Sequence, residues 1–103
     1  MIQVILKRPG EAPCMVLVEN ELRPLQDLVE GYIETVRLFS DTVILCNEEA
    51  LLLYMPYNCK ISGIKFHGPI AFVGTKRDEF GSVPMDLIKL HTIMPQLWEE
   101  DDE

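Results

Sequence analysis

Runs of apolar residues separated by short polar turns predict a chain that mixes strands and helices. Residues 2–7 (IQVILK) and 14–19 (CMVLVE) are rich in β-branched and aliphatic side chains, and a turn containing Pro9, Gly10 and Pro13 lies between them. The two runs predict neighbouring antiparallel strands. Both are too uniformly apolar for strands with one solvated face, so we expect cover on both faces or central positions.

Apolar residues at helical spacing follow from residue 24. Pro24 suits the first position of a helix, and Leu25, Leu28 and Val29 form one face. Gly31 is placed to form the C-terminal cap. Two turns of helix are unstable alone in water, so this face must dock on the sheet.

The chain is organised around residues 29–49 (VEGYIETVRLFSDTVILCNEE), which predict a helix end and a strand hairpin. Residues 32–38 alternate imperfectly, and the pattern leaves open which face is buried. Residues 39–41 form the turn, and 42–46 are continuously apolar, as expected for an interior strand. Residues 50–55 (ALLLYM) fit either a helical turn or another strand.

The second half predicts fewer regular elements. Residues 59–68 read as a loop or irregular strand, 69–74 as a short strand, and 75–81 as a polar connection. A last helix places Leu87, Ile88, His91 and Met94 on one face. We therefore expect an α+β fold, with one mixed, mostly antiparallel sheet of about 4–6 strands and two helices packed on it. Residues 1–98 form a single globular domain, and 99–103 an acidic disordered tail.

Charge is unevenly distributed along the 103 residues. The net charge is −8, and residues 11–49 hold nine acids against only Arg23 and Arg37. Such a field repels nucleic acid and attracts basic protein surfaces. The basic residues 60, 65, 76, 77 and 89 form no dense stripe, so we expect no direct nucleic-acid binding.

Catalytic and metal-binding patterns are missing from the sequence. Its three cysteines and two histidines show no zinc-ligand spacing, the glycines are scattered, and no serine lies in a nucleophile motif. We predict no catalytic residue, no metal and no cofactor, and hence no enzyme. No segment approaches the ~20 apolar residues of a membrane span, and the start lacks the pattern of a secretory signal. We expect no membrane partner and a cytoplasmic protein.

Acidic residues in and around the predicted hairpin form the candidate partner-binding site. Two interpretations stay open: a solvated face, as charged runs usually are, or a patch that occupies a basic groove meant for nucleic acid. The candidate residues are Glu30, Glu34, Asp41, Glu48 and Glu49.

Three short motifs carry a family resemblance that covers nearly the whole chain. They are G-Y-I-E-T-V-R-L from Gly31, V-I-L-C-N-E-E from Val43, and Pro56-Tyr57-Asn58. With them the chain resembles a family of small domains of unknown function from Gram-positive bacteria, their phages and mobile elements. This sequence departs from the pattern at Ala50, where glycine is common, and in its acidic tail.

The resemblance implies a function that residue spacing does not show. In length and charge the chain is similar to an anti-CRISPR member of that family, which inhibits type II RNA-guided nucleases. It implies a small acidic, non-enzymatic inhibitor that acts in the bacterial host cell and binds the type II CRISPR effector nuclease or its guide complex. The alternative is a regulatory or accessory binding module of a phage or mobile element, without a nuclease target. The oligomeric state stays open.

Overall fold

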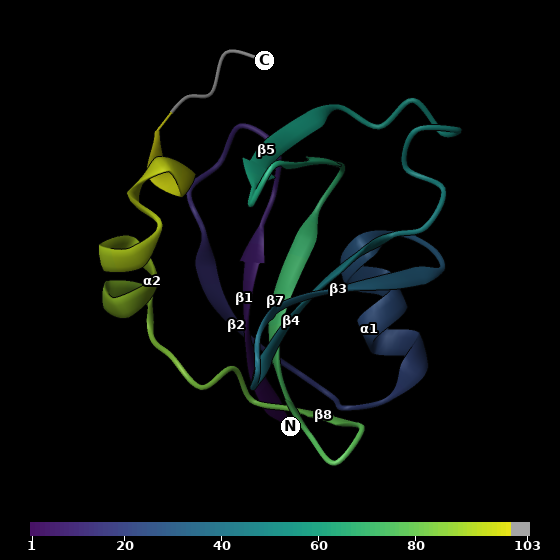
Figure 1. Ribbon diagram of the computed structural model, residues 1–103. Coiled ribbons are helices and arrows are strands. Elements are labelled where there is room, and N and C mark those ends of the chain that lie inside the picture. The colour runs from purple at the N-terminus through teal and green to yellow at the C-terminus, as the bar shows by residue number, and fades with distance from the viewer. Residues whose placement is uncertain (100–103) are drawn as a thin grey trace.

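A six-stranded sheet forms the centre of the computed structural model, which describes residues 1–99 (Figure 1). Every strand pairing in it is antiparallel. Five strands lie side by side in the order β2 (Cys14–Val18), β1 (Ile2–Lys7), β7 (Ile70–Lys76), β4 (Thr42–Asn47) and β3 (Ile33–Phe39), and β8 (Glu79–Gly81) pairs with the end of β7.

The continuous apolar runs fill the middle of this sheet. All six residues of β4 are buried, as are four of β1 and five of β7. The prediction of a strand covered on both faces or central in the sheet is therefore correct for residues 2–7 and wrong for residues 14–19. Strand β2 lies at an edge, where the side chain of Leu17 is 62% exposed.

Different elements cover the two faces of the sheet. Helix α1 (Leu22–Val29) packs on one face, on the right of Figure 1. Helix α2 (Leu87–Ile93), the 3₁₀ turn η1 (Pro95–Trp98) and a separate hairpin, β5 (Tyr57–Ile61) with β6 (Ile64–His67), cover the other. The α+β prediction is confirmed, with the two helices on opposite faces of an antiparallel sheet.

Helix α1 begins two residues earlier than predicted, and its C-terminal cap is Glu30 instead of Gly31. Pro24 is its third residue, still in the first turn, where the N–H groups have no intrahelical acceptor. Glu30 adopts the left-handed conformation (φ 62°), and the Gly31 N–H donates to the Gln26 carbonyl at 3.1 Å. A Cβ on Gly31 would lie 2.7 Å from Nδ2 of Asn47, so close packing explains this glycine better than capping does.

Helix α2 buries only part of the face predicted. Met94 is buried and Leu87 packs against the core, as predicted, whereas Ile88 and His91 are exposed and Leu90, off the predicted face, is fully buried. His91 contacts Trp98 edge-on instead, with the ring centroids 4.8 Å apart. On so short a helix the apolar face with Ile88 lies next to the apolar face with Leu90, and packing on the sheet buries the face with Leu90.

Residues 57–67 form a hairpin where the sequence suggested a loop or irregular strand. Its turn is made by Ser62 and Gly63, both with positive φ. The buried side chain of Asn58 ties the hairpin to the main sheet, since its Nδ2 donates to the carbonyls of Lys7 and Gly68, both at 2.8 Å.

The sequence also predicted an acidic tail and no membrane-spanning segment. Of the predicted acidic tail, residues 100–103 lie outside the described residues, and Glu99 ends the η1 turn. Within residues 1–99, neither helix has the length and apolar character needed to cross a membrane.

The buried amide of Asn47 joins three segments at one end of the sheet. Its Nδ2 donates to the Val29 carbonyl at 3.0 Å, and its Oδ1 accepts from the Glu49 N–H at 2.7 Å. It lies opposite Ile33 in the β3–β4 pairing. The end of α1, the start of β3 and the chain that leaves β4 therefore meet on one side chain.

We predict that Asn47→Ala lowers the free energy of unfolding by about 2–4 kcal/mol, because it leaves a carbonyl and an N–H without their partner. Urea denaturation at constant m-value measures the change. Asn20→Ala is the matched control, since the exposed Asn20 amide donates to the Phe80 carbonyl at 2.7 Å and its loss should cost under about 1 kcal/mol. Equal losses in the two variants would contradict the role given to Asn47.

Candidate functional site

Four of the five predicted acidic residues meet at the end of the sheet where β3 begins and β4 ends. Glu34 on β3 pairs with Cys46 on β4, and Glu48 and Glu49 follow β4 directly. Glu30 ends α1 beside them. We call these four residues, Glu30, Glu34, Glu48 and Glu49, the acidic corner.

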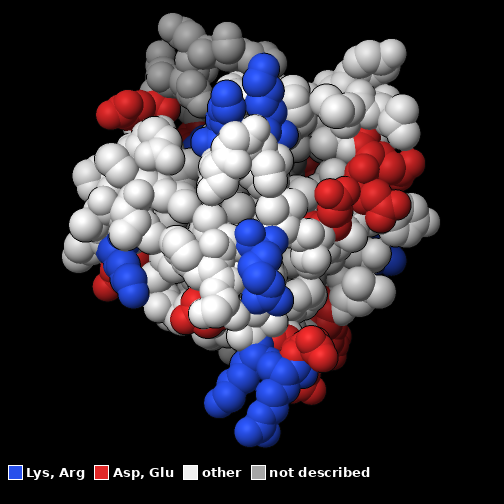
Figure 2. Space-filling view, viewed as in Figure 1, with Lys and Arg blue, Asp and Glu red and all other residues white. Residues whose placement is uncertain are grey.

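Two open grooves meet at the acidic corner. Glu34, Glu48 and Glu49 line a groove of ≈ 450 Å³, whose far wall is strand β6. Glu30 and Glu49 line a second groove of ≈ 480 Å³ against α1. In Figure 2 a cluster of acidic side chains lies on the right, where Figure 1 shows the chain that leaves β4. A partner seated at this corner would contact carboxylates from three elements.

Asp41 does not join the other four. It precedes β4 and lines a pocket with the β7–β8 hairpin. The six residues of β4 separate it from Glu48, a span of about 20 Å. Its Oδ1 accepts from the Thr42 hydroxyl at 3.0 Å. The sequence placed all five acids around one hairpin, and the hairpin puts Asp41 at its opposite end.

Within residues 1–99, no ion pair joins the carboxylates of the acidic corner to a base. Acids outnumber bases in both grooves, since Lys65 is the base lining the groove against β6 and Arg23, paired with Asp27, the base lining the groove against α1. Both ion pairs found in residues 1–99, Arg8–Glu11 and Arg23–Asp27, involve other acids. Arg37, the one base of the hairpin, donates instead to the Ser40 carbonyl at 3.0 Å. The corner is therefore free to pair with cations from outside the molecule.

A run of exposed apolar side chains projects beside the acidic corner, and sequence reasoning missed it. Leu51, Leu52, Leu53 and Tyr54 are 72%, 76%, 55% and 94% exposed. They belong to the connection from β4 to β5, at the upper right of Figure 1. The periodicity of so short a run fits either a helical turn or a strand, and it does not predict whether the side chains are buried or exposed. The one signal in the sequence that these residues lie at the surface is that they follow the acidic pair Glu48 and Glu49.

Cys46 lies beside Glu34 but is no nucleophile. Its thiol donates to the Glu34 carbonyl at a sulfur–oxygen distance of 3.5 Å, and the side chain is buried. Burial, and then the negative charge of Glu34, raise the pKa of the Cys46 thiol to about 11. Reactive cysteines have depressed pKa values, so this thiol serves packing. No group of three His, Cys, Asp or Glu side chains in residues 1–99 is arranged to hold a metal ion.

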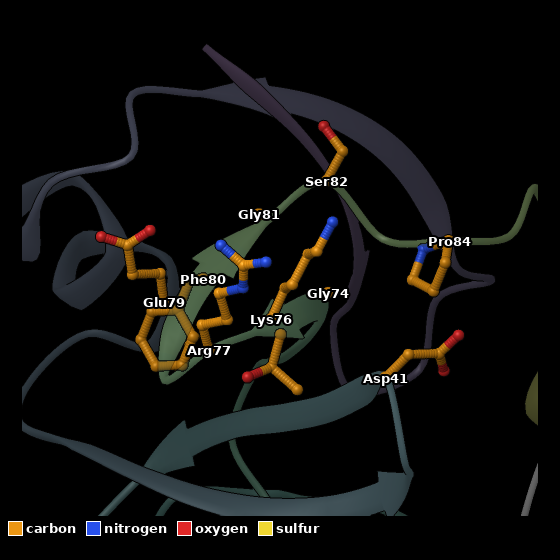
Figure 3. Close-up of a pocket in the computed structure, with 10 residues that line it drawn as sticks. Asp41, Gly74, Lys76, Arg77, Glu79, Phe80, Gly81, Ser82 and Pro84 are labelled. Atoms are coloured by element: carbon orange, nitrogen blue, oxygen red, sulfur yellow. The ribbon is translucent and has the colours of Figure 1, made fainter.

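The opposite end of the sheet holds a pocket of mixed charge, of ≈ 520 Å³. Lys76 and Arg77, at the β7–β8 turn, line it together with Asp41 and Glu79. Figure 3 shows the two basic side chains between the two carboxylates. Equal numbers of both signs make a poor phosphate-binding surface, because affinity for nucleic acid depends on a net excess of Lys and Arg.

Comparisons with known proteins identify one family. The sequence model of a family described as "Domain of unknown function (DUF3846)" matches residues 2–96. The comparisons with curated proteins and with solved structures gave no match.

We predict that Cys46 in the folded protein reacts slowly with iodoacetamide, since at a pKa of about 11 only about one thiol in a thousand is ionised at pH 8. Cys14, half-buried on the edge strand β2, serves as the faster internal comparison. Mass spectrometry of alkylated protein from pH 7 to pH 10 measures both rates.

Glu34→Gln should speed the alkylation of Cys46, because removing the neighbouring negative charge lowers the pKa of the thiol. The rate should still stay below that of Cys14, because burial is the larger cause of the raised pKa. A pH profile unchanged by Glu34→Gln would show that the charge of Glu34 does not reach the thiol.

Proposed function

We propose, for a chain that belongs to the DUF3846 family of domains of unknown function, a non-enzymatic role as an inhibitor that binds a basic surface on a protein. The family description assigns no reaction, so the binding role rests on the geometry of the site and the choice of partner on the sequence resemblance. The proposed partner is a type II RNA-guided nuclease or its guide complex, and the proposed source of the chain is a phage or mobile element acting in the bacterial cytoplasm.

The observation that carries the proposal is the acidic corner. Its four carboxylates come from α1, β3 and the chain after β4, and no ion pair within residues 1–99 neutralises them. Carboxylates form strong, charge-assisted hydrogen bonds with Arg and Lys. A local field of one sign also raises the rate of encounter with a surface of the opposite sign.

Type II nucleases offer surfaces of the required chemistry. They hold the guide–target heteroduplex in a positively charged channel, and arginines read the short duplex motif beside the target. An acidic corner seated in either place would occupy the position of phosphates and exclude nucleic acid. The choice of this partner rests on the family resemblance of the sequence, and the charge pattern supports it.

A regulatory or accessory module is the second candidate. The groove beside β6 favours it, because Phe66 and His67 from the hairpin and Cys46 from the sheet line it together with the acids. Such a groove could hold a small ligand. Salt separates the two functions, since charge pairing with a basic protein surface weakens as salt is added, whereas binding of a small ligand through apolar contacts changes little.

We predict that replacing Glu34, Glu48 and Glu49 by Lys weakens inhibition of a susceptible type II nuclease by about tenfold or more, because each change turns an attraction into a repulsion. A cleavage assay with nuclease, guide and target DNA measures the effect. The protein is added either before or after guide loading, to locate the blocked step.

The matched control replaces Glu19, Glu21 and Glu79 by Lys. These exposed acids lie at the other end of the sheet, where Asn20 contacts the strand β8, and the two variants gain the same charge. The control should inhibit nearly as well as wild type. Equal inhibition by both variants would rule out the acidic corner as the binding surface, and no inhibition of several nucleases by wild type would end the inhibitor proposal.

A further inference from the structure

The apolar run at residues 51–54 is not needed by the core. Each of its four side chains is more than half exposed, while Ala50 before it is buried and Met55 after it packs against Gly68. Single exposed apolar residues are normal, but a contiguous group marks an interaction surface. The run is therefore held at both ends and presents its side chains outward.

The backbone of the run is already ordered by its own hydrogen bonds. The N–H of Leu53 donates to the Glu49 carbonyl at 2.9 Å, that of Tyr54 to Leu51 at 3.2 Å, and that of Met55 to Ala50 at 3.0 Å. Asn47, two residues before Glu49, fixes the start of this turn. Little conformational entropy remains to be lost on binding, which favours affinity.

Tyr54 stands out because its residue type does not suit its position at the end of this turn. Its backbone adopts the left-handed conformation (φ 54°), which glycine and asparagine adopt more easily than an aromatic residue. Its side chain is 94% exposed and so gains almost nothing from packing. Departures from local preference without a structural gain are typical of functional positions, and tyrosine is enriched in interface hot spots.

We infer that residues 51–54 form an apolar anchor that seats in an apolar pocket on a partner protein, and that Lys and Arg surround this pocket. The inference deepens the proposed function and rests on it for the identity of the partner. Leu51 and Leu52 line the same groove as Glu34, Glu48 and Glu49, in which Lys65 is the one Lys or Arg among residues 1–99, so a surface that receives the anchor also meets an excess of carboxylates. Interfaces commonly place apolar anchors at the centre, within a polar rim.

Charge argues against two other occupants of this surface. A second copy would bring two acidic corners together, and the four carboxylates of each would repel the other. An anionic membrane surface would repel the same carboxylates and attracts polybasic segments instead. A basic-rimmed protein pocket satisfies both the apolar and the acidic parts of the surface.

The test compares wild type with an anchor variant that carries Leu51→Ser, Leu52→Ser and Tyr54→Gly. Ile88→Ser is the matched control, because Ile88 on α2 is 78% exposed and lies on the other face of the sheet from α1. The anchor variant should unfold at the same temperature as wild type or above it, because glycine suits the backbone of residue 54. A large loss of stability would show that the run serves folding and would overturn the inference.

The first probe is a displayed library of random dodecapeptides, selected on wild type. We expect enriched peptides that combine aromatic or aliphatic residues with Arg or Lys. They should bind the anchor variant about tenfold or more weakly and the Ile88→Ser control as well as wild type. Enriched peptides that ignore the anchor, or that depend on it but lack basic residues, would overturn the inference.

The other occupants are tested with the same proteins. Light scattering reports self-association, and sedimentation with phosphatidylserine vesicles reports membrane binding. Wild type should stay monomeric and should not sediment with the vesicles. Dimers or vesicle binding that disappear in the anchor variant would overturn the inference in favour of a second copy or a lipid surface.

The nuclease assay separates this inference from the proposed function. If wild type inhibits and the anchor variant inhibits about tenfold less, the inhibitor role and the anchor are both supported. If both proteins inhibit equally, the anchor is wrong and the inhibitor role stands. If wild type inhibits no nuclease, the inhibitor role is wrong, and the peptide selection alone decides whether the anchor binds a basic-rimmed apolar partner.

Discussion

The buried side chain of Asn47 is the constraint on which the arrangement of the acidic corner depends. One amide accepts from the chain after β4 and donates to the end of α1, and it leaves no room for a side chain on Gly31. A polar group buried in this way must keep its partners, because leaving it without them costs about 1–3 kcal/mol, more than the net contribution of the hydrogen bond itself. The scaffold and the proposed binding surface are thus joined through a single residue.

Two of the five non-glycine residues with positive φ in residues 1–99 lie near this end of the sheet, and the other three, Ser62, Arg77 and Asp78, form hairpin turns elsewhere. Glu30 places a negative charge at the negative end of α1 and adopts the left-handed conformation. Tyr54 adopts that conformation too, with its ring in solvent. Glu48 and Glu49 lie between them without an ion pair inside residues 1–99. Each feature is mildly unfavourable for folding, and a binding role gives all of them one explanation.

The sequence predicted those parts of the fold that burial alone determines. Strands β1, β4 and β7 are continuous apolar runs, and all three lie in the interior of the sheet. The hairpin β5–β6 was not recognised, because one face of it is solvated and Lys60 and Lys65 interrupt its apolar pattern.

The candidate site was predicted only in part. The pattern could not separate Asp41 from the other acids, because distance along a strand becomes distance in space only once the hairpin is known. It also could not find the exposed run at 51–54, since an apolar residue looks the same in sequence whether it is buried or displayed.

In the proposed interaction, the acidic corner and the apolar run at residues 51–54 would act at different stages of binding. Charge acts over about a Debye length and so mainly raises the association rate, whereas apolar contact acts only after docking and mainly slows dissociation. Carboxylates alone would give a fast but short-lived complex in physiological salt, and an apolar run alone would associate slowly and without selectivity. Only Ala50 separates Glu49 from the run at 51–54, and hydrogen bonds between Asn47 and Met55 hold both in one turn. In the proposed complex, the fold would therefore couple electrostatic attraction to apolar contact, and a partner would need to satisfy both to stay bound.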